Sequence, residues 1–256
     1  LIMLDNSGSM SSKLYNSVEV YYPLDVATDS SGNVYVMEYH NNRIKVFDSS
    51  GAYLRSFGGY GGPGSCNRWQ YARQFDIYND KIYIADTYGH RIKVLNLNGG
   101  CVWNNGARYY YPHAIAVGSS YVYVGHTNNY VSMYSTNGVH QVNAHYNSYF
   151  GYVWGMSLNS AGNKLLIANY NNRVAEFNLS GQSITYQQTS NHAYSSSNGY
   201  FNRPTDTGYD SSGNIYALDL YNHRIQKFNS SLTYQAKTGS YSVSSGFRYP
   251  YGMHID

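Results

Sequence analysis

The chain has 256 residues, with 17 Lys and Arg against 14 Asp and Glu, which gives a net charge of +3. Only 12% of the residues are charged, so we expect no nucleic-acid partner and no attraction to a membrane surface, and no apolar stretch is long enough to span a bilayer. The 32 Tyr favour β-structure, because a ring that is apolar and a hydroxyl that is polar suit half-buried strands.

Six short β-rich segments recur along the chain, and each of the first five is followed by a turn or a second β-rich run. Three of them begin with Tyr-Pro, and Pro is compatible with the first position of a strand because no ladder hydrogen bond is lost there. We predict that these segments are the innermost strands of repeated sheets, at 22–29, 73–79, 111–118, 152–159, 203–210 and 249–256.

A β-hairpin pattern follows the innermost strand in most repeats. It consists of a β-rich run, a polar loop, an Arg, a second β-rich run and a turn of Asn, Ser and Gly. Four clear copies and one degraded copy occupy 32–51, 80–99, 162–181, 213–231 and 120–138, the last being the degraded one. Outer strands follow, for example at 52–58 and 232–239. The repeat interval of roughly 40 to 50 residues is typical of the four-stranded blades of a β-propeller.

The runs Asn42-Arg43-Ile44, His90-Arg91-Ile92, Asn172-Arg173-Val174 and His223-Arg224-Ile225, together with the Ser-Ser-Gly-Asn turns at 30–33 and 211–214, resemble the NHL repeat family. The resemblance implies an all-β, six-bladed β-propeller of four-stranded antiparallel blades, with residues 1–256 as a single domain. One blade would be shared between the N- and C-terminal segments, which leaves no long exposed edge. Two alternatives stay open: the chain is an excerpt of a longer polypeptide, or a neighbouring molecule completes that blade and builds a polymer.

The repeated arginines, Arg43, Arg91, Arg173 and Arg224, are interpreted as structural. Each follows an acidic or amide residue that closes the preceding strand: Glu38, Asp86, Asn169 and Asp219. An Arg–carboxylate pair in each blade would hold the loop against its strand. The alternative, a basic face for RNA, is disfavoured because the 17 Lys and Arg are spread over the chain.

The mouth of the central channel is the expected ligand site, because propeller ligands enter where the innermost strands converge. Aligning these strands at Pro places aromatic side chains beside two carboxylates. The candidate ligand-binding residues are Asp25, His113, Trp154, Asp206 and Tyr251. They suit a sugar or a peptide, while the competing interpretation is that they only fill and hydrate the channel.

Metal and catalytic sites are not expected. His113 and His254 both lie on innermost strands, and a related propeller enzyme, peptidyl-amidoglycolate lyase, holds a metal with histidines in its channel. A third such histidine is missing, and a catalytic metal needs about three protein ligands.

Asp5, Ser7 and Ser9 resemble the metal loop of von Willebrand A domains, but no strand–helix alternation follows. No Ser-His-Asp set, phosphate loop or acid/base pair is recognisable, and no cofactor is expected.

The sequence therefore predicts a non-enzymatic, extracellular or cell-surface module that binds protein or glycan, with self-assembly into an oligomer or filament as an extension. Recognition is expected in the Tyr-rich loops 58–71 and 188–202. The alternative is a metal-dependent lyase or hydrolase acting at the channel. Asn178 and Asn229 begin glycosylation sequons. A disulfide between Cys66 and Cys101 is possible in an oxidising compartment, but the sequence leaves it open.

Overall fold

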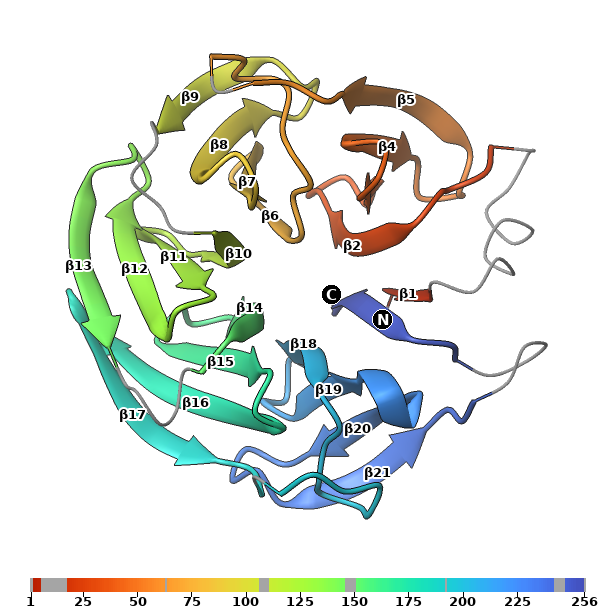
Figure 1. The fold of residues 1–256 in the computed structure, drawn as a ribbon, viewed down its shortest axis with the longest axis vertical. Helices are drawn as coiled ribbons and strands as arrows, with labels where there is room; N and C mark the ends of the chain where they lie inside the picture. Colours follow the sequence, from red (N-terminus) through yellow and green to blue (C-terminus); the bar gives the residue numbers. More distant parts are fainter. Residues whose placement is uncertain are drawn as a thin grey trace.

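The computed structural model describes residues 2–5, 18–62, 64–105, 111–145, 151–191, 193–241 and 247–255. The Asp5, Ser7 and Ser9 side chains of the proposed metal loop lie outside this part. The described chain is an all-β propeller in which antiparallel sheets stand around a central axis, with the innermost strands at the centre (Figure 1).

Five sheets have four antiparallel strands each, in chain order from the axis outward. Blade 1 contains β2 (Pro23–Thr28), β3 (Val34–Glu38), β4 (Arg43–Phe47) and β5 (Tyr53–Gly58). Blade 2 contains β6 (Phe75–Tyr78), β7 (Lys81–Asp86), β8 (Arg91–Asn96) and β9 (Cys101–Asn105). Blade 3 contains β10 (Pro112–Val117), β11 (Tyr121–His126), β12 (Tyr130–Ser135) and β13 (His140–His145). Blade 4 contains β14 (Val153–Leu158), β15 (Lys164–Asn169), β16 (Arg173–Ser180) and β17 (Ser183–Thr189). Blade 5 contains β18 (Pro204–Tyr209), β19 (Ile215–Asp219), β20 (Arg224–Phe228) and β21 (Tyr234–Thr238), with the 3-10 turn η2 (Leu220–Asn222) between β19 and β20.

The remaining sheet has two strands. β1 (Ile2–Asp5) pairs antiparallel with β22 (Pro250–His254), so the beginning and end of the chain meet in one sheet near the axis (Figure 1). β22 packs between β18 and β2, and the six innermost strands thus form a closed ring. The structure therefore has five four-stranded blades where six were predicted. The difference arises because only two strands of the terminal sheet lie in the described residues.

The hydrophobic core lies between neighbouring blades rather than at the axis. Blades 3 and 4 share a cluster in which Met133 and Val131 face Ile167, Ala175 and Phe177. Equivalent clusters join blades 1 and 2, blades 2 and 3, and blades 4 and 5. Packing between blades explains why the second and third strands are buried along most of their length.

Polar turns close the hairpins on one side of the ring. A side-chain oxygen of Asp29 accepts the N–H groups of Ser31 and Asn33, and Asp210 does the same for Ser212 and Asn214. This side-chain mimic of a backbone turn is why Asp, Asn and Ser recur there. We call this side of the ring the turn face.

The repeat arginines have different partners from blade to blade. Arg224 pairs with Asp219 at 2.8 Å, and Arg43 pairs with Glu38. In blade 2 the buried Lys93 takes that role, with its Nζ 3.3 Å from Asp86. Arg91 donates to the carbonyl oxygen of Gly89 instead, and Arg173 lies opposite the amide Asn169 in the register of β15 and β16.

Cys66 and Cys101 form a disulfide with their Cα atoms 5.5 Å apart. It ties the loop between blades 1 and 2 to the outer strand β9.

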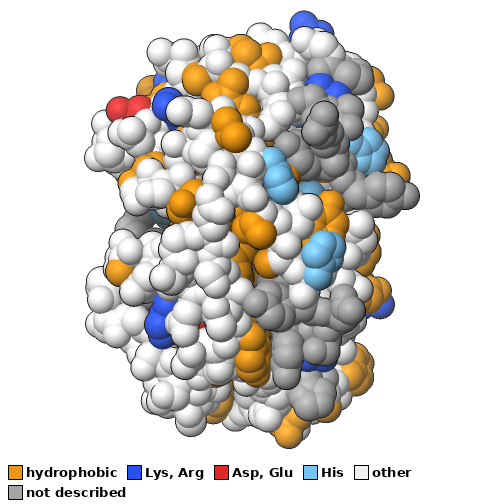
Figure 2. Space-filling view, turned by 90° about the vertical axis from the view of Figure 1, so that its left-hand side faces the viewer, with side chains coloured by type: hydrophobic (Ala, Val, Ile, Leu, Met, Phe, Trp, Pro, Cys, Tyr) orange, Lys and Arg blue, Asp and Glu red, His pale blue; other side chains and the backbone are white. Residues whose placement is uncertain are grey.

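Across the described residues, no helix combines the length and apolarity needed to cross a bilayer. The outer wall around β9, β13 and β17 carries few charged side chains (Figure 2).

Candidate functional site

The side of the ring opposite the turn face is covered by tyrosine and histidine. It is built from the loops that join the second and third strands of each blade and from the loops that lead to the next innermost strand. Of the eleven most exposed tyrosines in the described residues, only Tyr53 and Tyr78 lie elsewhere. We call this side the aromatic face; its exposed tyrosines are Tyr21, Tyr22, Tyr60, Tyr88, Tyr152, Tyr194, Tyr221, Tyr241 and Tyr249.

The rings of the aromatic face touch one another across blade boundaries. The centroid of Tyr71 lies 5.2 Å from Tyr39 and 5.7 Å from Tyr88, and Tyr88 lies 5.6 Å from Tyr111. Edge-to-face pairs at such distances are favourable beyond the area they bury. The rings therefore form a connected surface, which limits their freedom before any ligand arrives.

A repeated contact between blades positions these rings. The residue before each repeat arginine has a positive φ, which Asn and His adopt more readily than other non-Gly residues. Its side chain accepts the backbone N–H of the residue that precedes the next innermost strand. Arg203 donates in this way to Asn172 Oδ1 at 2.9 Å, and Tyr249 donates to His223 Nδ1 at 3.2 Å. The Asn-Arg and His-Arg runs thus hold adjacent blades together.

Three of the five predicted ligand-binding residues lie together on the axis below the aromatic face. The ring of Trp154 stacks on His113 at 5.6 Å and on Tyr251 at 6.4 Å. The indole Nε1 of Trp154 is buried and has no hydrogen-bond partner among the described residues. Burial, together with the nearby charge of Arg73, lowers the pKa of His113 to about 3, so its imidazole is neutral at ordinary pH.

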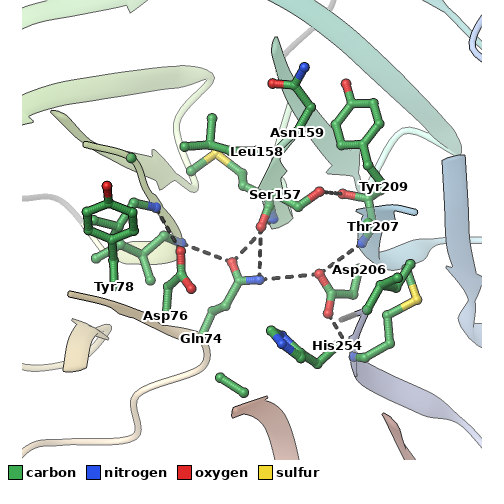
Figure 3. Close-up of a pocket in the computed structure, with 18 of the residues that line it drawn as sticks. Gln74, Asp76, Tyr78, Ser157, Leu158, Asn159, Asp206, Thr207, Tyr209 and His254 are labelled. Atoms are coloured by element: carbon green, nitrogen blue, oxygen red, sulfur yellow. Dashed lines mark hydrogen bonds between the residues drawn. The ribbon is translucent and has the colours of Figure 1, made fainter. Parts of the chain in front are cut away.

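The other two predicted residues, Asp25 and Asp206, lie deeper and line a cavity of about 330 Å³. The cavity is also lined by Tyr78 and by the turn at Asn159, so it opens toward the turn face (Figure 3). The structure therefore separates the predicted channel-mouth set into an aromatic group and an acidic group. The sequence did not reveal this because the two groups occupy adjacent positions in the alignment of the innermost strands, although each of the five residues lies on a different strand.

The carboxylates in the cavity are engaged by the backbone of neighbouring blades. Asp25 accepts the N–H of Phe75 at 2.8 Å. Asp206, which is labelled in Figure 3, accepts the N–H of Met253 at 2.9 Å. Gln74, which is not among the five predicted ligand-binding residues, donates to Asp206 and accepts the N–H of Ile115. Through these hydrogen bonds, the side chains link neighbouring innermost strands.

Burial perturbs the acidic group strongly. It raises the pKa of Asp206 to about 7 and that of Asp76 to about 6, although hydrogen bonds from backbone N–H groups oppose the shift. Burial, followed by the nearby charge of Asp206, raises the pKa of Asp25 well above its usual value. These carboxyls take up protons in the range where most acidic side chains have lost them.

His254 does not join His113. It lines the cavity toward the turn face, where its Nε2 lies 3.0 Å from Thr28 Oγ1. No group of three or more His, Cys, Asp or Glu side chains suited to a metal was found among the described residues.

A second concave site lies on the aromatic face. None of its residues is among the predicted ligand-binding residues, but Tyr194 and Asn202 belong to the loop 188–202, in which recognition was expected. The site is a groove of about 520 Å³ between blades 4 and 5, lined by Tyr170, Asn171, Asn172, Tyr194, Asn202, Arg203 and Tyr221. Its signal in the sequence is Arg203, which stands before Pro204 where Tyr22, Tyr111 and Tyr249 stand before the equivalent prolines.

The glycosylation candidates differ in their surroundings. Asn229 uses its side-chain oxygen to accept the N–H groups of Ser231 and Thr233 in a turn. Asn178 is exposed on β16, where its amide donates to Gln187 at 2.7 Å.

The fold is that of a β-propeller, and two of its blades match the NHL repeat. The sequence model of the NHL repeat matches residues 20–47 and 201–228, which cover blade 1 and blade 5 from before the innermost strand to the third strand. No curated protein matches the sequence.

Solved structures with a similar fold include virginiamycin B lyase from Staphylococcus aureus, in a selenomethionine-substituted form, with 16% identity and a TM-score of 0.66. A catalytically inactive variant of that enzyme with quinupristin has the same identity and a TM-score of 0.67. In both cases 91% of this chain and 74% of the other chain are covered. The expectation that this chain is not an enzyme is therefore corrected, because the fold it shares over nearly its whole length is that of a lyase.

Proposed function

We propose that this propeller is an extracellular binding module that holds a glycan on its aromatic face. The observation that carries the proposal is the concentration of nine exposed tyrosines on one side of the ring. Flat rings pack against the C–H faces of sugars, and their hydroxyls hydrogen-bond to sugar hydroxyls, so such a surface suits a polyhydroxylated ligand.

The polar groups near these rings support the same ligand class. Within the part of the chain that the structure describes, the buried Nε1 of Trp154 is a donor without an acceptor, and such donors are costly unless water or a ligand satisfies them. The carboxylates beneath the face, Glu38, Asp86 and Asp219, are buried beside Arg or Lys. They therefore do not offer the negative charge that would attract a cationic ligand.

An extracellular location is supported by the Cys66–Cys101 disulfide, because disulfides persist mainly in oxidising compartments. The sequons at Asn178 and Asn229 are consistent with it. Intact-mass measurement of native material tests this part: we expect no free thiol, whereas two reduced cysteines would argue against the location.

Binding to an oligosaccharide array, followed by calorimetry, tests the proposed function. We expect at least one glycan to bind, and Tyr249→Ala to weaken it several-fold. Tyr78→Ala is a matched control, because both rings are 37% exposed but Tyr78 lies on the turn face. Failure of every glycan to bind, or equal losses in the two variants, would contradict the proposal.

We also propose that the ring closes with a sixth blade, of which β1 and β22 are the two described strands. Its innermost strand already occupies the place between β18 and β2. Light scattering over a wide concentration range separates two ways of completing this blade. A species that stays monomeric favours completion within one chain, and growth into oligomers favours strand addition from a second copy.

A further inference from the structure

The groove between blades 4 and 5 combines aromatic walls with a cation that has no ion-pair partner among the described residues. The guanidinium of Arg203 lies over the ring of Tyr170 at 4.3 Å and near that of Tyr221 at 5.2 Å. Its one side-chain hydrogen bond among the described residues runs from Nη1 to the Tyr221 hydroxyl, at 3.4 Å. No ion pair of Arg203 with a described carboxylate exists, so most of its N–H groups remain available.

The backbone fixes this arginine in place. Arg203 has a φ of +58°, and its N–H is bound by Asn172 of the preceding blade. The side chain therefore projects from the left-handed position that Tyr occupies in blades 1, 2, 3 and in the terminal sheet. Arg203 therefore places a charge where the equivalent positions carry a neutral Tyr ring, and this distinguishes the groove from the corresponding places between other blades.

Two side-chain amides line the groove beside the guanidinium, and neither has a hydrogen-bond partner among the described residues. The side chains of Asn171 and Asn202 make no hydrogen bond to any described residue, although the backbone N–H of each is bound within its loop. Each amide offers two donors and one acceptor. Tyr194, which is 72% exposed, completes the wall of the groove with a ring that has little to pack against.

We propose that this groove binds the carboxylate-bearing unit of an acidic glycan, such as a uronic acid residue. The proposal rests on the proposed function and names its ligand class. The planar fork of Arg203 matches a carboxylate through two parallel hydrogen bonds. The amides of Asn171 and Asn202 take sugar hydroxyls, and Tyr194 and Tyr221 cover the faces of the ring. A lone carboxylate such as a peptide C-terminus would use the arginine but leave both amides unused.

Calorimetry with three defined probes tests this assignment: an oligouronate, the same oligosaccharide with its carboxyl groups reduced, and a sulfated neutral oligosaccharide. We expect only the oligouronate to bind well, with Arg203→Met and carboxyl reduction each weakening binding by roughly tenfold or more. Asn171→Ala, a milder change in an exposed loop, should weaken it several-fold. Lys237→Met removes the same charge from the exposed strand β21 and should change binding less than twofold.

The outcomes separate the two proposals. If the reduced or sulfated oligosaccharide binds as well as the oligouronate, or if Arg203→Met binds normally, the assignment of an acidic sugar is wrong while a glycan-binding face stands. If no oligosaccharide binds but a carboxylate-bearing peptide does so through Arg203, both proposals fail. Thermal unfolding of each variant establishes that it is folded before its affinity is compared.

Discussion

The imidazole Nδ1 of His90 accepts the backbone N–H of Tyr111 at 3.2 Å, and this single contact joins a loop of blade 2 to the start of the innermost strand of blade 3. The ring of His90 also packs on Tyr111, with the centroids 4.4 Å apart. The same atom types recur between other blades. The contact therefore explains why the repeat requires Asn or His before its arginine.

Replacing His90 with Leu should destabilise the protein by about 1 to 3 kcal/mol. The backbone N–H of Tyr111 loses its acceptor, and Leu adopts a positive φ less readily than His. His90→Asn should recover much of the loss, since Asn172 makes the equivalent bond. Urea unfolding of the three proteins measures the difference. Equal stability of the Leu variant and the wild type would show that the contact does not contribute to the free energy of unfolding.

Asp206 should make stability depend on pH between about 4 and 7. Its pKa is about 7 in the folded protein and near 3.8 when unfolded. The stabilising contribution is therefore complete below pH 4 and is lost as pH rises through 7. Relative to Asp206→Asn, the wild type should lose up to about 1.4 kcal/mol per pH unit in this window.

Asp210 on the turn face is the control for this measurement. Burial opposes the shift, but hydrogen bonds from Asn214 and Ser212 lower its pKa. Its contribution should be present above pH 4 and be lost as pH falls further, so Asp210→Asn should leave the profile between pH 4 and 7 unchanged. Parallel profiles for the wild type and Asp206→Asn would contradict the assignment.

Gly155 should not tolerate a side chain. A Cβ there would lie 2.3 Å from the carbonyl oxygen of Thr205 and 2.8 Å from the Cα of Asp206, both on the adjacent innermost strand. Gly155→Ala should cost about 2 kcal/mol or more, because two backbones must separate. Gly62→Ala, which meets nothing within 4 Å, should be nearly neutral. Thermal unfolding distinguishes the two, and similar midpoints would refute the close approach.

Arg224 should hold the loop that carries Tyr194 in place. Besides Asp219 it binds the carbonyl oxygens of Ser196, Ser197 and Tyr200 at 2.8 to 3.0 Å. Arg224→Met removes the ion-pair partner of the buried Asp219 carboxylate and the side-chain donor to the carbonyl oxygens of Ser196 and Ser197, while Gln226 still donates to Tyr200. The expected cost is about 3 to 5 kcal/mol. Limited proteolysis should then cut at residues 191–202 first. Cleavage elsewhere with this loop intact would contradict the role.

Reduction of the Cys66–Cys101 disulfide should lower stability by about 2 to 4 kcal/mol, because the bond closes a loop with a sequence separation of 35. The unfolding midpoint with and without reductant measures this. The double variant Cys66→Ser, Cys101→Ser should unfold at the reduced midpoint in both buffers. A reductant effect that persists in the double variant would have another origin.

The sequence predicted most of the local structure. The β-rich runs of each repeat, Pro at strand starts and turns of Asn, Ser and Gly located all six innermost strands to within about two residues, since strand pairing inside a blade depends on neighbours in the chain. Four-stranded blades followed from the repeat length. The six-blade count was not confirmed, because it depended on segments at both ends that have no repeat signature of their own.

The candidate sites were predicted less well, and for a physical reason. The alignment grouped Asp25 and Asp206 with His113, Trp154 and Tyr251, but successive residues of a strand face different surroundings, and one set faces the cavity of the turn face. Likewise, Asp86 preceded Arg91 in the expected pattern, yet Lys93 is its ion-pair partner. A one-dimensional pattern cannot rank two cations that both reach one carboxylate.

The amino-acid sequence by itself determined the blades, because each hairpin forms from residues near one another in the chain. Only the tertiary structure decided which side chains meet between blades, including the bond of His90 to Tyr111 and the groove around Arg203. Those contacts join residues about 20 to 30 positions apart across the gap between two sheets, and their geometry exists only once the ring has closed.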